Sequence, residues 1–281
     1  MKDFAGKVAV ITGAGRGIGR GIALHCAKEG MKIVLAGIGM ESLTKTNTDL
    51  QAMGAETLVV QTDVSLLKDV ENLAAKSYEA FGSVNLLVNN AGVEVRTSLL
   101  ESSMDDWNWV MGVNFYGVLY GARTFIPQMI KQNTTGHVVN VSSACGIVDG
   151  GICAGSYGVS KHAVLALTEG LYRELGNSAP HVKVSAFCPG YVKTELDTSE
   201  RSRPARFKAH VTLATEEERA AWRAGLDGGF SIEESARLLF EGLQDDKLYI
   251  GPQAWLELHP DLHESIRNRA ENIINERNPE F

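Results

Sequence analysis

Short runs of apolar residues, separated by longer stretches with helical spacing, constrain the fold of this chain more than any other feature. Runs such as VAVI, LLV and HVVNV are continuously hydrophobic instead of alternating between apolar and polar residues. Such strands are buried on both faces, which is typical of a parallel sheet covered by helices. We therefore predict a doubly wound α/β fold. The strands are expected at residues 8–12, 32–36, 57–61, 86–89, 137–141 and 183–187.

The rhythm of strands and helices predicts one domain over residues 1–281, since α/β sheets often reach this size as a single unit. Residues from about 195 to 230 interrupt the rhythm, because they are rich in charge and poor in apolar runs. We expect this segment, called the lid below, to be a helical insertion. Further along, IEESARLLFEGL has helical spacing and KLYIG is a candidate last strand. The polar tail, about 253–281, is expected to be helical.

The charge balance excludes several classes of partner. The chain carries 27 Lys and Arg against 34 Asp and Glu, a formal net charge of −7. Nucleic acids and anionic membranes require a basic face, so neither is an expected partner. The N-terminus has neither a signal pattern nor an apolar stretch approaching ~20 residues. A cytoplasmic protein with a small-molecule substrate is expected.

Metal and disulfide chemistry have little support in the sequence. The four cysteines are Cys26, Cys145, Cys153 and Cys188. They lack a paired spacing such as C-x-x-C, which predicts reduced thiols and no zinc site. His259 and His263 are four residues apart, but Pro260 would disturb a helix through both and no third ligand is evident. We predict no metal.

A glycine-rich loop follows the first strand and opens a helix. It reads Thr12-Gly-Ala-Gly-Arg-Gly-Ile-Gly19, with the spacing T-G-x-x-x-G-x-G and not the G-x-G-x-x-G of the standard dinucleotide fingerprint. Bare glycines let the backbone approach a pyrophosphate, and the N–H groups and dipole at the helix start attract negative charge. The loop therefore favours a dinucleotide site; a tight turn whose glycines serve only packing is the alternative.

The residues after the second predicted strand favour NADP over NAD. An enzyme that prefers NAD would carry an Asp or Glu there to bind the ribose 2′-hydroxyl. Here residues 37–39 are Gly-Ile-Gly, and no carboxylate appears until Glu41. Arg16, inside the glycine loop, is suited to neutralise a 2′-phosphate. NADP(H) is the favoured cofactor, with NAD(H) possible and a solvated Arg16 as the alternative.

Tyr157 and Lys161 open a predicted helix, and positions i and i+4 share one helix face. An ammonium ~4 Å from the phenol, at an effective dielectric of ~20, would favour the phenolate by about 4 kcal/mol, near three pKa units. The phenol is then expected to titrate near neutrality and to exchange a proton with a carbonyl oxygen. A Y-x-x-x-K pattern alone is most often a surface pair, so the interpretation depends on the other motifs.

The motifs together resemble the short-chain dehydrogenase/reductase family, in its single-domain branch. They occur in the family's order over about residues 7–194: the glycine loop, Asn89-Asn-Ala-Gly92, Asn114, Ser143, Y-x-x-x-K and Pro189-Gly190. The resemblance implies a Rossmann-like sheet and a lid that carries substrate specificity. It also implies a homodimer or homotetramer built on helices beside the active site.

The resemblance also implies catalytic roles. Tyr157 matches the general acid/base, Lys161 the residue that grips the nicotinamide ribose, and Asn114 the residue that holds a proton-relay water. Ser142 and Ser143 are adjacent, and the family's S-x-x-G pattern selects Ser143 to bind the carbonyl oxygen. The interval to Tyr157 is one residue longer than is common, which suggests an insertion within GIVDGGICAGS.

The cofactor contacts implied by the resemblance come from five segments. The expected residues are Gly13, Arg16, Gly17, Ile18, Gly19, Asp63, Val64, Asn90, Ala91, Gly92, Tyr157, Lys161, Pro189, Gly190, Val192 and Thr194. Asp63 and Val64 are expected at the adenine ring. The basic cluster of the lid, with Arg201, Arg203, Arg206 and Lys208, is interpreted as a solvated face rather than an anion site.

The expected function is an NAD(P)-dependent oxidoreductase that interconverts a carbonyl and an alcohol, as a carbonyl reductase or alcohol dehydrogenase. One alternative is a cofactor-sensing regulatory protein without turnover, and another is an alcohol dehydrogenase that prefers NAD. Epimerases and dehydratases of the family's extended branch also use Y-x-x-x-K, but they have a different glycine loop and a larger second domain. The sequence does not identify the substrate.

Overall fold

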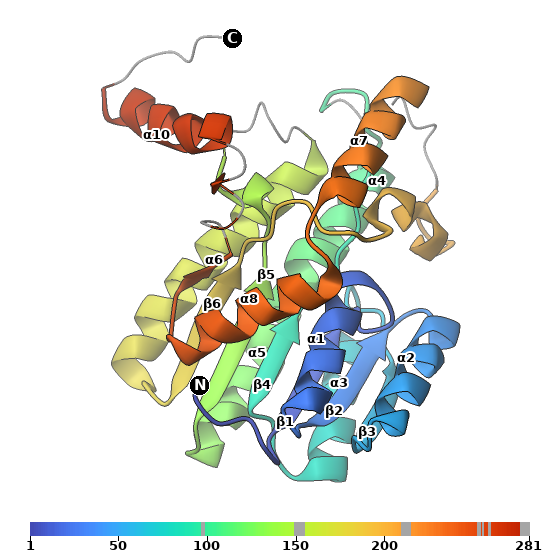
Figure 1. Cartoon of the computed structure of the whole chain (residues 1–281), viewed down its shortest axis with the longest axis vertical. Coiled ribbons are helices and arrows are strands. Elements are labelled where there is room, and N and C mark those ends of the chain that lie inside the picture. Colours follow the sequence, from blue (N-terminus) through green and yellow to red (C-terminus); the bar gives the residue numbers. More distant parts are fainter. Residues whose placement is uncertain are drawn as a thin grey trace.

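The computed structural model describes residues 1–96, 99–148, 155–208, 215–251, 254, 256–257 and 260–275. Within these residues seven strands form one parallel sheet in the order β3-β2-β1-β4-β5-β6-β7 (Figure 1). The strands are β1 (Val8–Thr12), β2 (Lys32–Gly37), β3 (Thr57–Gln61), β4 (Leu86–Asn89), β5 (Gly136–Val141), β6 (Val182–Phe187) and β7 (Tyr249–Ile250). All six predicted strands and the candidate last strand are confirmed.

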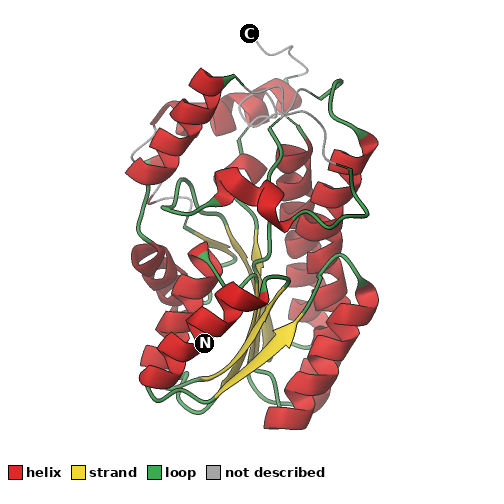
Figure 2. Ribbon diagram, turned by 90° about the vertical axis from the view of Figure 1, so that its right-hand side faces the viewer, coloured by secondary structure: helices red, strands yellow, loops and turns green. Residues whose placement is uncertain are grey.

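Helices cover both faces of the sheet, as Figure 2 shows. One face packs against α1 (Gly17–Lys28), α2 (Met40–Ala52) and α8 (Ile232–Gln244). The other packs against α3 (Leu67–Phe81), α5 (Gly117–Gln132) and α6 (Ser156–Ser178). Along β1, Ala9 and Ile11 face the first layer and Val8 and Val10 the second, and all four are buried. This two-sided burial explains the continuous apolar runs, and the predicted Rossmann-like, doubly wound fold is confirmed.

The strand order reverses between β1 and β4. Chain connections run outward from β1 to β3 on one side and from β4 to β7 on the other. In an open parallel sheet, this reversal leaves a crevice at the carboxyl ends of the two central strands, where ligands bind. The glycine loop follows β1 and the Asn-Asn-Ala-Gly segment follows β4. The fold therefore brings these two predicted motifs to one place.

The described part of the lid contains a 3-10 segment, η3 (Leu196–Ser202), and α7 (Glu216–Gly228). Helix α7 begins at a capping box, in which Thr215 Oγ1 accepts from the Glu218 N–H and Glu218 accepts from the Thr215 N–H. The described part of this segment is therefore largely helical. In Figure 1, α7 rises beside α4 (Met104–Met111), above the carboxyl ends of the strands.

In the tail, the structure describes one helix, α10 (Pro260–Ile274). Leu262 of α10 packs with Ala144 and Val148, which follow β5. Arg269 donates to His162 Nε2 at 2.7 Å and to the Val148 carbonyl at 3.3 Å. The tail thus lies against the segment that links β5 to α6.

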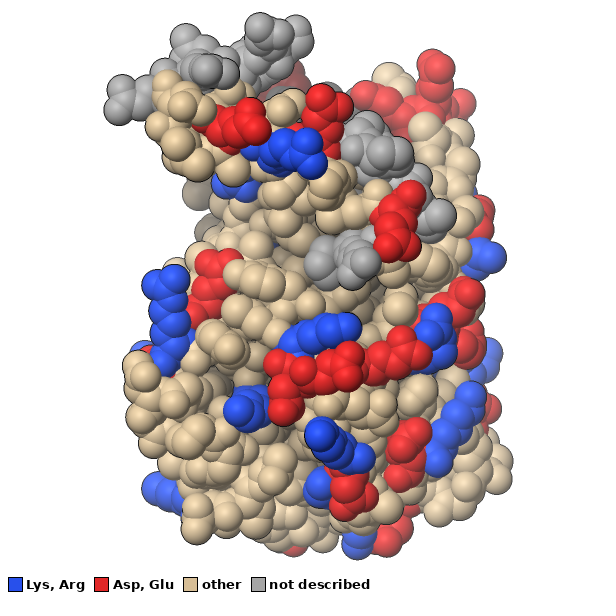
Figure 3. All heavy atoms as spheres, turned by 60° about the vertical axis from the view of Figure 1, so that its left-hand side comes forward, with Lys and Arg blue, Asp and Glu red and all other residues tan. Residues whose placement is uncertain are grey.

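Acidic and basic side chains lie interspersed on the face seen in Figure 3, without a continuous basic area. Among the described residues, none of the helices is both long enough and apolar enough to cross a bilayer.

Candidate active site

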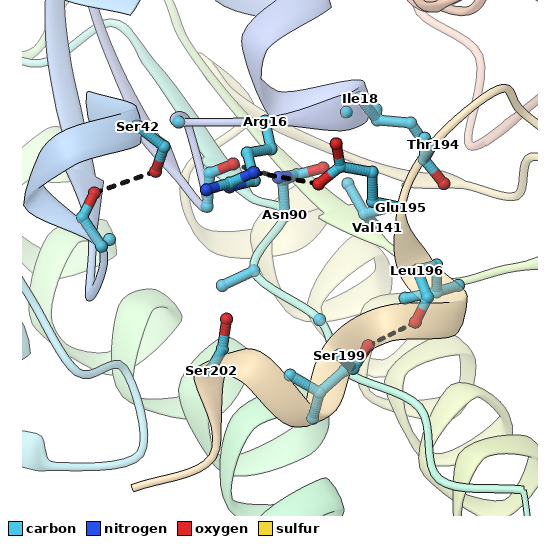
Figure 4. A pocket seen from close by; sticks show the side chains of 18 of the residues that line it. Arg16, Ile18, Ser42, Asn90, Val141, Thr194, Glu195, Leu196, Ser199 and Ser202 are labelled. Carbon is cyan, nitrogen blue, oxygen red and sulfur yellow. Dashed lines mark hydrogen bonds and ion pairs between the residues drawn. The ribbon is translucent and has the colours of Figure 1, made fainter. Parts of the chain in front are cut away.

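A cavity of about 620 Å³ lies at the carboxyl ends of the central strands (Figure 4). The glycine loop, the Asn-Asn-Ala-Gly segment, the segment after β6 and the lid all contribute to its wall. The predicted site residues that line it are Gly13, Arg16, Gly17, Ile18, Asn90, Ala91, Gly92, Ser143, Tyr157, Lys161, Pro189, Gly190, Val192 and Thr194. The structure therefore brings most of the predicted residues together.

The glycine loop leaves backbone donors facing this cavity. Gly13 has φ +65°, and a Cβ there would lie 2.9 Å from the Ala91 Cα. A Cβ at Gly19 would lie 2.4 Å from the Gly13 carbonyl oxygen, so the turn is too tight for a side chain. Helix α1 then begins at Gly17 without a side-chain cap and without an acidic residue in its first turn. Its first N–H groups fit the diphosphate of a dinucleotide.

The segment after β4 is tied to the end of β1. Thr12 Oγ1 accepts from the Asn90 and Ala91 N–H groups at 2.9 and 3.0 Å, and Asn90 Nδ2 donates to the Thr12 carbonyl at 2.8 Å. These bonds fix Gly92, where a Cβ would lie 3.6 Å from Lys161 Nζ. A Cβ at that position would be in ordinary van der Waals contact with the lysine, so Gly92 lies directly beside Lys161.

Ser143 and Tyr157 face each other through a hydrogen bond between their hydroxyl groups. Ser143 Oγ also accepts from the Cys145 N–H at 3.1 Å, which fixes its orientation. The neighbouring Ser142 hydroxyl instead donates to the Lys161 carbonyl at 2.8 Å. The choice of Ser143 over Ser142 therefore agrees with the geometry. Residues 149–154, which hold most of the suspected insertion, lie outside the described residues.

The expectation that Tyr157 titrates near neutrality is wrong for this structure. Burial, followed by the negative charge of Glu94, raises the pKa of Tyr157 above its ordinary value. Lys161 Nζ lies 5.5 Å from the centre of the Tyr157 ring and donates to the Val141 carbonyl at 2.9 Å. Burial lowers the pKa of Lys161 itself to about 8. The i, i+4 spacing fixes which face the two residues share, but not where Nζ points.

Asn114 lies within a π-helix, η1 (Gly112–Tyr116), that links α4 to α5. Its Oδ1 accepts from the Val93 N–H at 2.9 Å, and its Nδ2 donates to the Val93 carbonyl at 2.9 Å and to Ser160 Oγ at 3.0 Å. The side-chain amide thus holds the Val93 backbone beside the cavity. The role of Asn114 in holding a proton-relay water stays a prediction.

Three predicted cofactor residues do not line the cavity: Gly19, Asp63 and Val64. Gly19 acts through the tight turn described above. Asp63 Oδ2 accepts from Arg206 Nη2 of the segment after η3 at 2.7 Å, and its Oδ1 accepts from Ser65. Val64 packs against the backbone of Gly117. The adenine contact of Asp63 and Val64 stays a prediction.

One member of the basic cluster of the lid, Arg203, is not part of a solvated face. The Arg203 side chain is only 5% exposed and forms an ion pair of 2.6 Å with the fully buried Asp106 on α4. Its guanidinium lies 4.2 Å from the centre of the buried Trp109 ring. Arg203 and Arg201 both line the cavity. The solvated interpretation is therefore wrong for Arg203. The ion pair could not be read from the local sequence, because Asp106 lies 97 residues earlier in the chain.

One cysteine prediction also fails. Cys26 and Cys188 are free and buried, as expected of reduced thiols. Cys145, two residues after Ser143, is disulfide-bonded, and its partner lies outside the described residues. The absence of a C-x-x-C spacing did not exclude a bond formed by the folded chain.

Sequence reasoning missed Glu94, which lies beside the catalytic candidates. Its side chain is 10% exposed and accepts from Arg96 Nε at 3.2 Å, and its N–H donates to Ser199 Oγ of η3 at 3.1 Å. Burial, opposed by Arg96 and Lys161, raises the pKa of Glu94 from 4.5 to about 7. A lone Glu after an Asn-Asn-Ala-Gly segment carries no sequence signal of such burial.

The raised pKa of Glu94 makes stability depend on pH. The stability that the folded state gains by binding a proton at Glu94 is fully present below 4.5, the pKa of this carboxyl group in the unfolded chain. It is lost as the pH rises through about 7, because the folded state opposes ionisation of the carboxyl group. We expect Glu94→Gln, which cannot ionise, to gain stability relative to wild type between pH 5 and pH 8 by roughly 3 kcal/mol. Urea unfolding at both pH values measures this, with the exposed Glu71→Gln as control. An equal difference at both pH values would refute the assignment.

Comparisons with known proteins identify the family of this chain. Residues 7–205 match the family described as short chain dehydrogenase. A "CLA biosynthesis dehydrogenase/reductase" of Lactiplantibacillus plantarum is 32% identical over 287 residues, covering 100% of this chain and 97% of the relative. The chain belongs to the short-chain dehydrogenase family and is an oxidoreductase of that family.

Two solved structures extend the comparison. A short-chain dehydrogenase/reductase from Burkholderia phymatum, in complex with NAD, is 41% identical with a TM-score of 0.90, covering 100% of this chain and 99% of that chain. An alcohol dehydrogenase from the archaeon Thermococcus sibiricus, complexed with 5-hydroxy-NADP, is 28% identical with a TM-score of 0.67, covering 85% and 90%. Both forms of nicotinamide cofactor thus occur among the similar structures.

Proposed function

We propose that this protein interconverts a carbonyl and an alcohol, with a nicotinamide dinucleotide as cofactor and Tyr157 as general acid/base. The observation that carries the proposal is the hydrogen-bonded Ser143–Tyr157 pair in the same cavity as the glycine loop and Lys161. A dinucleotide with its diphosphate on α1 would extend along this cavity toward the hydroxyl pair. When bound, the cofactor supplies or accepts the hydride.

Each residue then has a defined task in carbonyl reduction. Because its pKa is raised, Tyr157 is protonated at neutral pH, which is the form that donates a proton to the carbonyl oxygen. The Ser143 hydroxyl donates a hydrogen bond to the same oxygen and stabilises the negative charge that develops there. Lys161, beside Gly92, holds a positive charge near the phenol and is suited to bind the nicotinamide ribose. The reverse sequence oxidises an alcohol.

NADP is part of the proposal, because the end of β2 offers no carboxylate to a ribose 2′-hydroxyl. Residues 37–39 line the cavity as Gly-Ile-Gly, and Arg16 lines the same cavity. The Burkholderia protein binds NAD, so the preference of this chain needs its own measurement. It rests on Arg16.

The experiment is a fluorescence titration with NADPH and NADH, followed by a panel of carbonyl compounds monitored by loss of NADPH absorbance. We expect tighter binding of NADPH than of NADH and turnover of at least one carbonyl. Tighter NADH binding would overturn the cofactor preference alone. Tight binding without turnover of any carbonyl or alcohol would favour a cofactor sensor over an enzyme.

The expected partners are a small-molecule substrate and further copies of this chain in a cytoplasmic homodimer or homotetramer. Support for self-association comes from exposed aromatic and aliphatic side chains on the helices beside the active site. Tyr116, Val159 and Tyr172 are each nearly half exposed. Size-exclusion chromatography with light scattering tests this expectation, and a monomer at micromolar concentration would contradict it.

A further inference from the structure

Two arginines converge on one carboxylate at the wall of the cavity. Arg16 Nη1 of the glycine loop lies 2.9 Å from Glu195 Oε2, and Arg201 Nη2 of η3 lies 3.2 Å from the same oxygen. Figure 4 shows Arg16 and Glu195 extended toward each other, from the glycine loop and from the lid. All three residues line the cavity. The glycine loop and the lid thus meet through a cluster of two positive charges and one negative charge.

Arg201 is held in this position by its own segment. Its Nη1 donates to the Glu195 carbonyl at 2.9 Å, to the Thr198 carbonyl at 2.8 Å, and also to the Thr198 hydroxyl. These bonds fix the plane of the guanidinium, while Nη2 is the nitrogen directed at the Glu195 side chain. An arginine whose planar group is already oriented loses little further freedom when it binds an anion.

The Glu195 carboxylate is a weak occupant of the space between the arginines. Its side chain is 56% exposed and that of Arg16 is 49% exposed, so water competes for the ion pair. Exposed pairs of this kind contribute about 0–1 kcal/mol. A 2′-phosphate or a diphosphate carries more negative charge and more acceptor oxygens than one carboxylate, and therefore matches two guanidinium groups better. Exchange of Glu195 for a phosphate would therefore cost little and gain two strong contacts.

We propose that Arg201 is a phosphate-binding residue supplied by the lid, which acts with Arg16 on a phosphate group of the bound dinucleotide after Glu195 turns away. The proposal rests on the proposed function for the identity of the ligand. Two phosphates of such a cofactor share the required chemistry: the 2′-phosphate of NADP and the diphosphate common to NADP and NAD. Cofactor binding would then draw the lid toward the glycine loop.

The test compares Arg201→Met, Glu195→Gln and a control, Arg237→Met, on the full chain. Arg237 forms an exposed ion pair with Glu241 on α8 and does not line the cavity. Dissociation constants are measured by fluorescence for NADPH and NADH, and by calorimetry for adenosine 2′-monophosphate and ADP. We expect Arg201→Met to raise the Kd of NADPH about 10-fold or more, since a charge-assisted contact is lost. Glu195→Gln should lower it, because a competing negative charge is removed, and Arg237→Met should leave it unchanged.

The four ligands separate the two sources of phosphate. If the arginines bind the 2′-phosphate, Arg201→Met weakens NADPH and adenosine 2′-monophosphate but leaves NADH and ADP within twofold of wild type. If they bind the diphosphate, the variant weakens NADPH, NADH and ADP alike. Either pattern supports the proposal.

The proposal and the proposed function fail in different ways. Wild-type protein that binds neither NADPH nor NADH would refute the proposed function. Normal wild-type binding, with all four ligands within twofold for Arg201→Met and no gain for Glu195→Gln, would refute the phosphate role of Arg201 alone. If Arg201→Met fails to fold, as judged by circular dichroism, Glu195→Gln decides: tighter NADPH binding supports the proposal, and unchanged or weaker binding overturns it.

Discussion

Replacing Tyr157 by Phe is expected to reduce kcat about 10³-fold or more, while the Kd of NADPH stays within about twofold of wild type. The phenol hydroxyl is hydrogen-bonded to Ser143, and a positioned general acid contributes roughly 10²–10⁴-fold to the rate. The phenyl ring of Phe retains the packing of the buried aromatic side chain, so only the proton transfer and its hydrogen bond are removed. Steady-state kinetics on a carbonyl found by the panel, with a parallel fluorescence titration, measures both quantities.

The matched control for this experiment is Tyr172→Phe. Tyr172 lies on the same helix as Tyr157 but is 47% exposed, so loss of its hydroxyl should leave kcat unchanged. Activity of Tyr157→Phe within tenfold of wild type would exclude Tyr157 as the general acid. A large loss of NADPH binding would instead indicate that the hydroxyl contributes mainly to holding the cofactor.

Removal of the Arg203 guanidinium is expected to lower the free energy of unfolding by roughly 3 kcal/mol, because the buried Asp106 carboxylate loses its cationic partner. Hydrogen bonds from Ser103 and Arg203 outweigh burial and lower the pKa of Asp106, so this side chain is charged at neutral pH. Arg203→Met keeps an aliphatic side chain of similar length, but removes the guanidinium with its ion pairs to Asp106 and Glu200 and its contact with the Trp109 ring. Urea unfolding measures the loss, and tryptophan fluorescence reports any release of the lid from α4.

Two further variants define what this result means. Arg237→Met removes an exposed ion pair and should change stability by less than about 0.5 kcal/mol. Adding Asp106→Asn to Arg203→Met removes the unpaired charge and should restore part of the lost stability. A loss below 1 kcal/mol for Arg203→Met would show that water or another group compensates Asp106, and that this pair does not hold the lid.

The sequence predicted the sheet well because strand burial on both faces leaves a local signature. The predicted bounds of β1, β3 and β4 agree with the structure, and β2, β5 and β6 each extend by one residue. The glycine loop was equally predictable from the sequence. A Cβ at Gly19 would lie 2.4 Å from the Gly13 carbonyl oxygen, so only glycine fits this turn. Features set by neighbours along the chain were therefore recovered.

Features set by distant partners were not recovered. The pairing of Arg203 with Asp106 joins residues 97 positions apart, and no local pattern distinguishes it from a solvated charge. The burial of Glu94 and its effect on Tyr157 depend on how the lid closes over the Asn-Asn-Ala-Gly segment. The direction of Lys161 Nζ toward the Val141 carbonyl similarly follows from the packing of α6 on β5, not from the i, i+4 spacing.

The shortness of β7 has a consequence for solubility at that edge of the sheet. β7 contributes only Tyr249 and Ile250 and pairs on one side with β6. A long edge strand offers a row of unpaired N–H and C=O groups that can template fibrillar aggregation, whereas a two-residue strand offers almost none. This protein should therefore resist amyloid-like strand addition at its β7 edge even when concentrated.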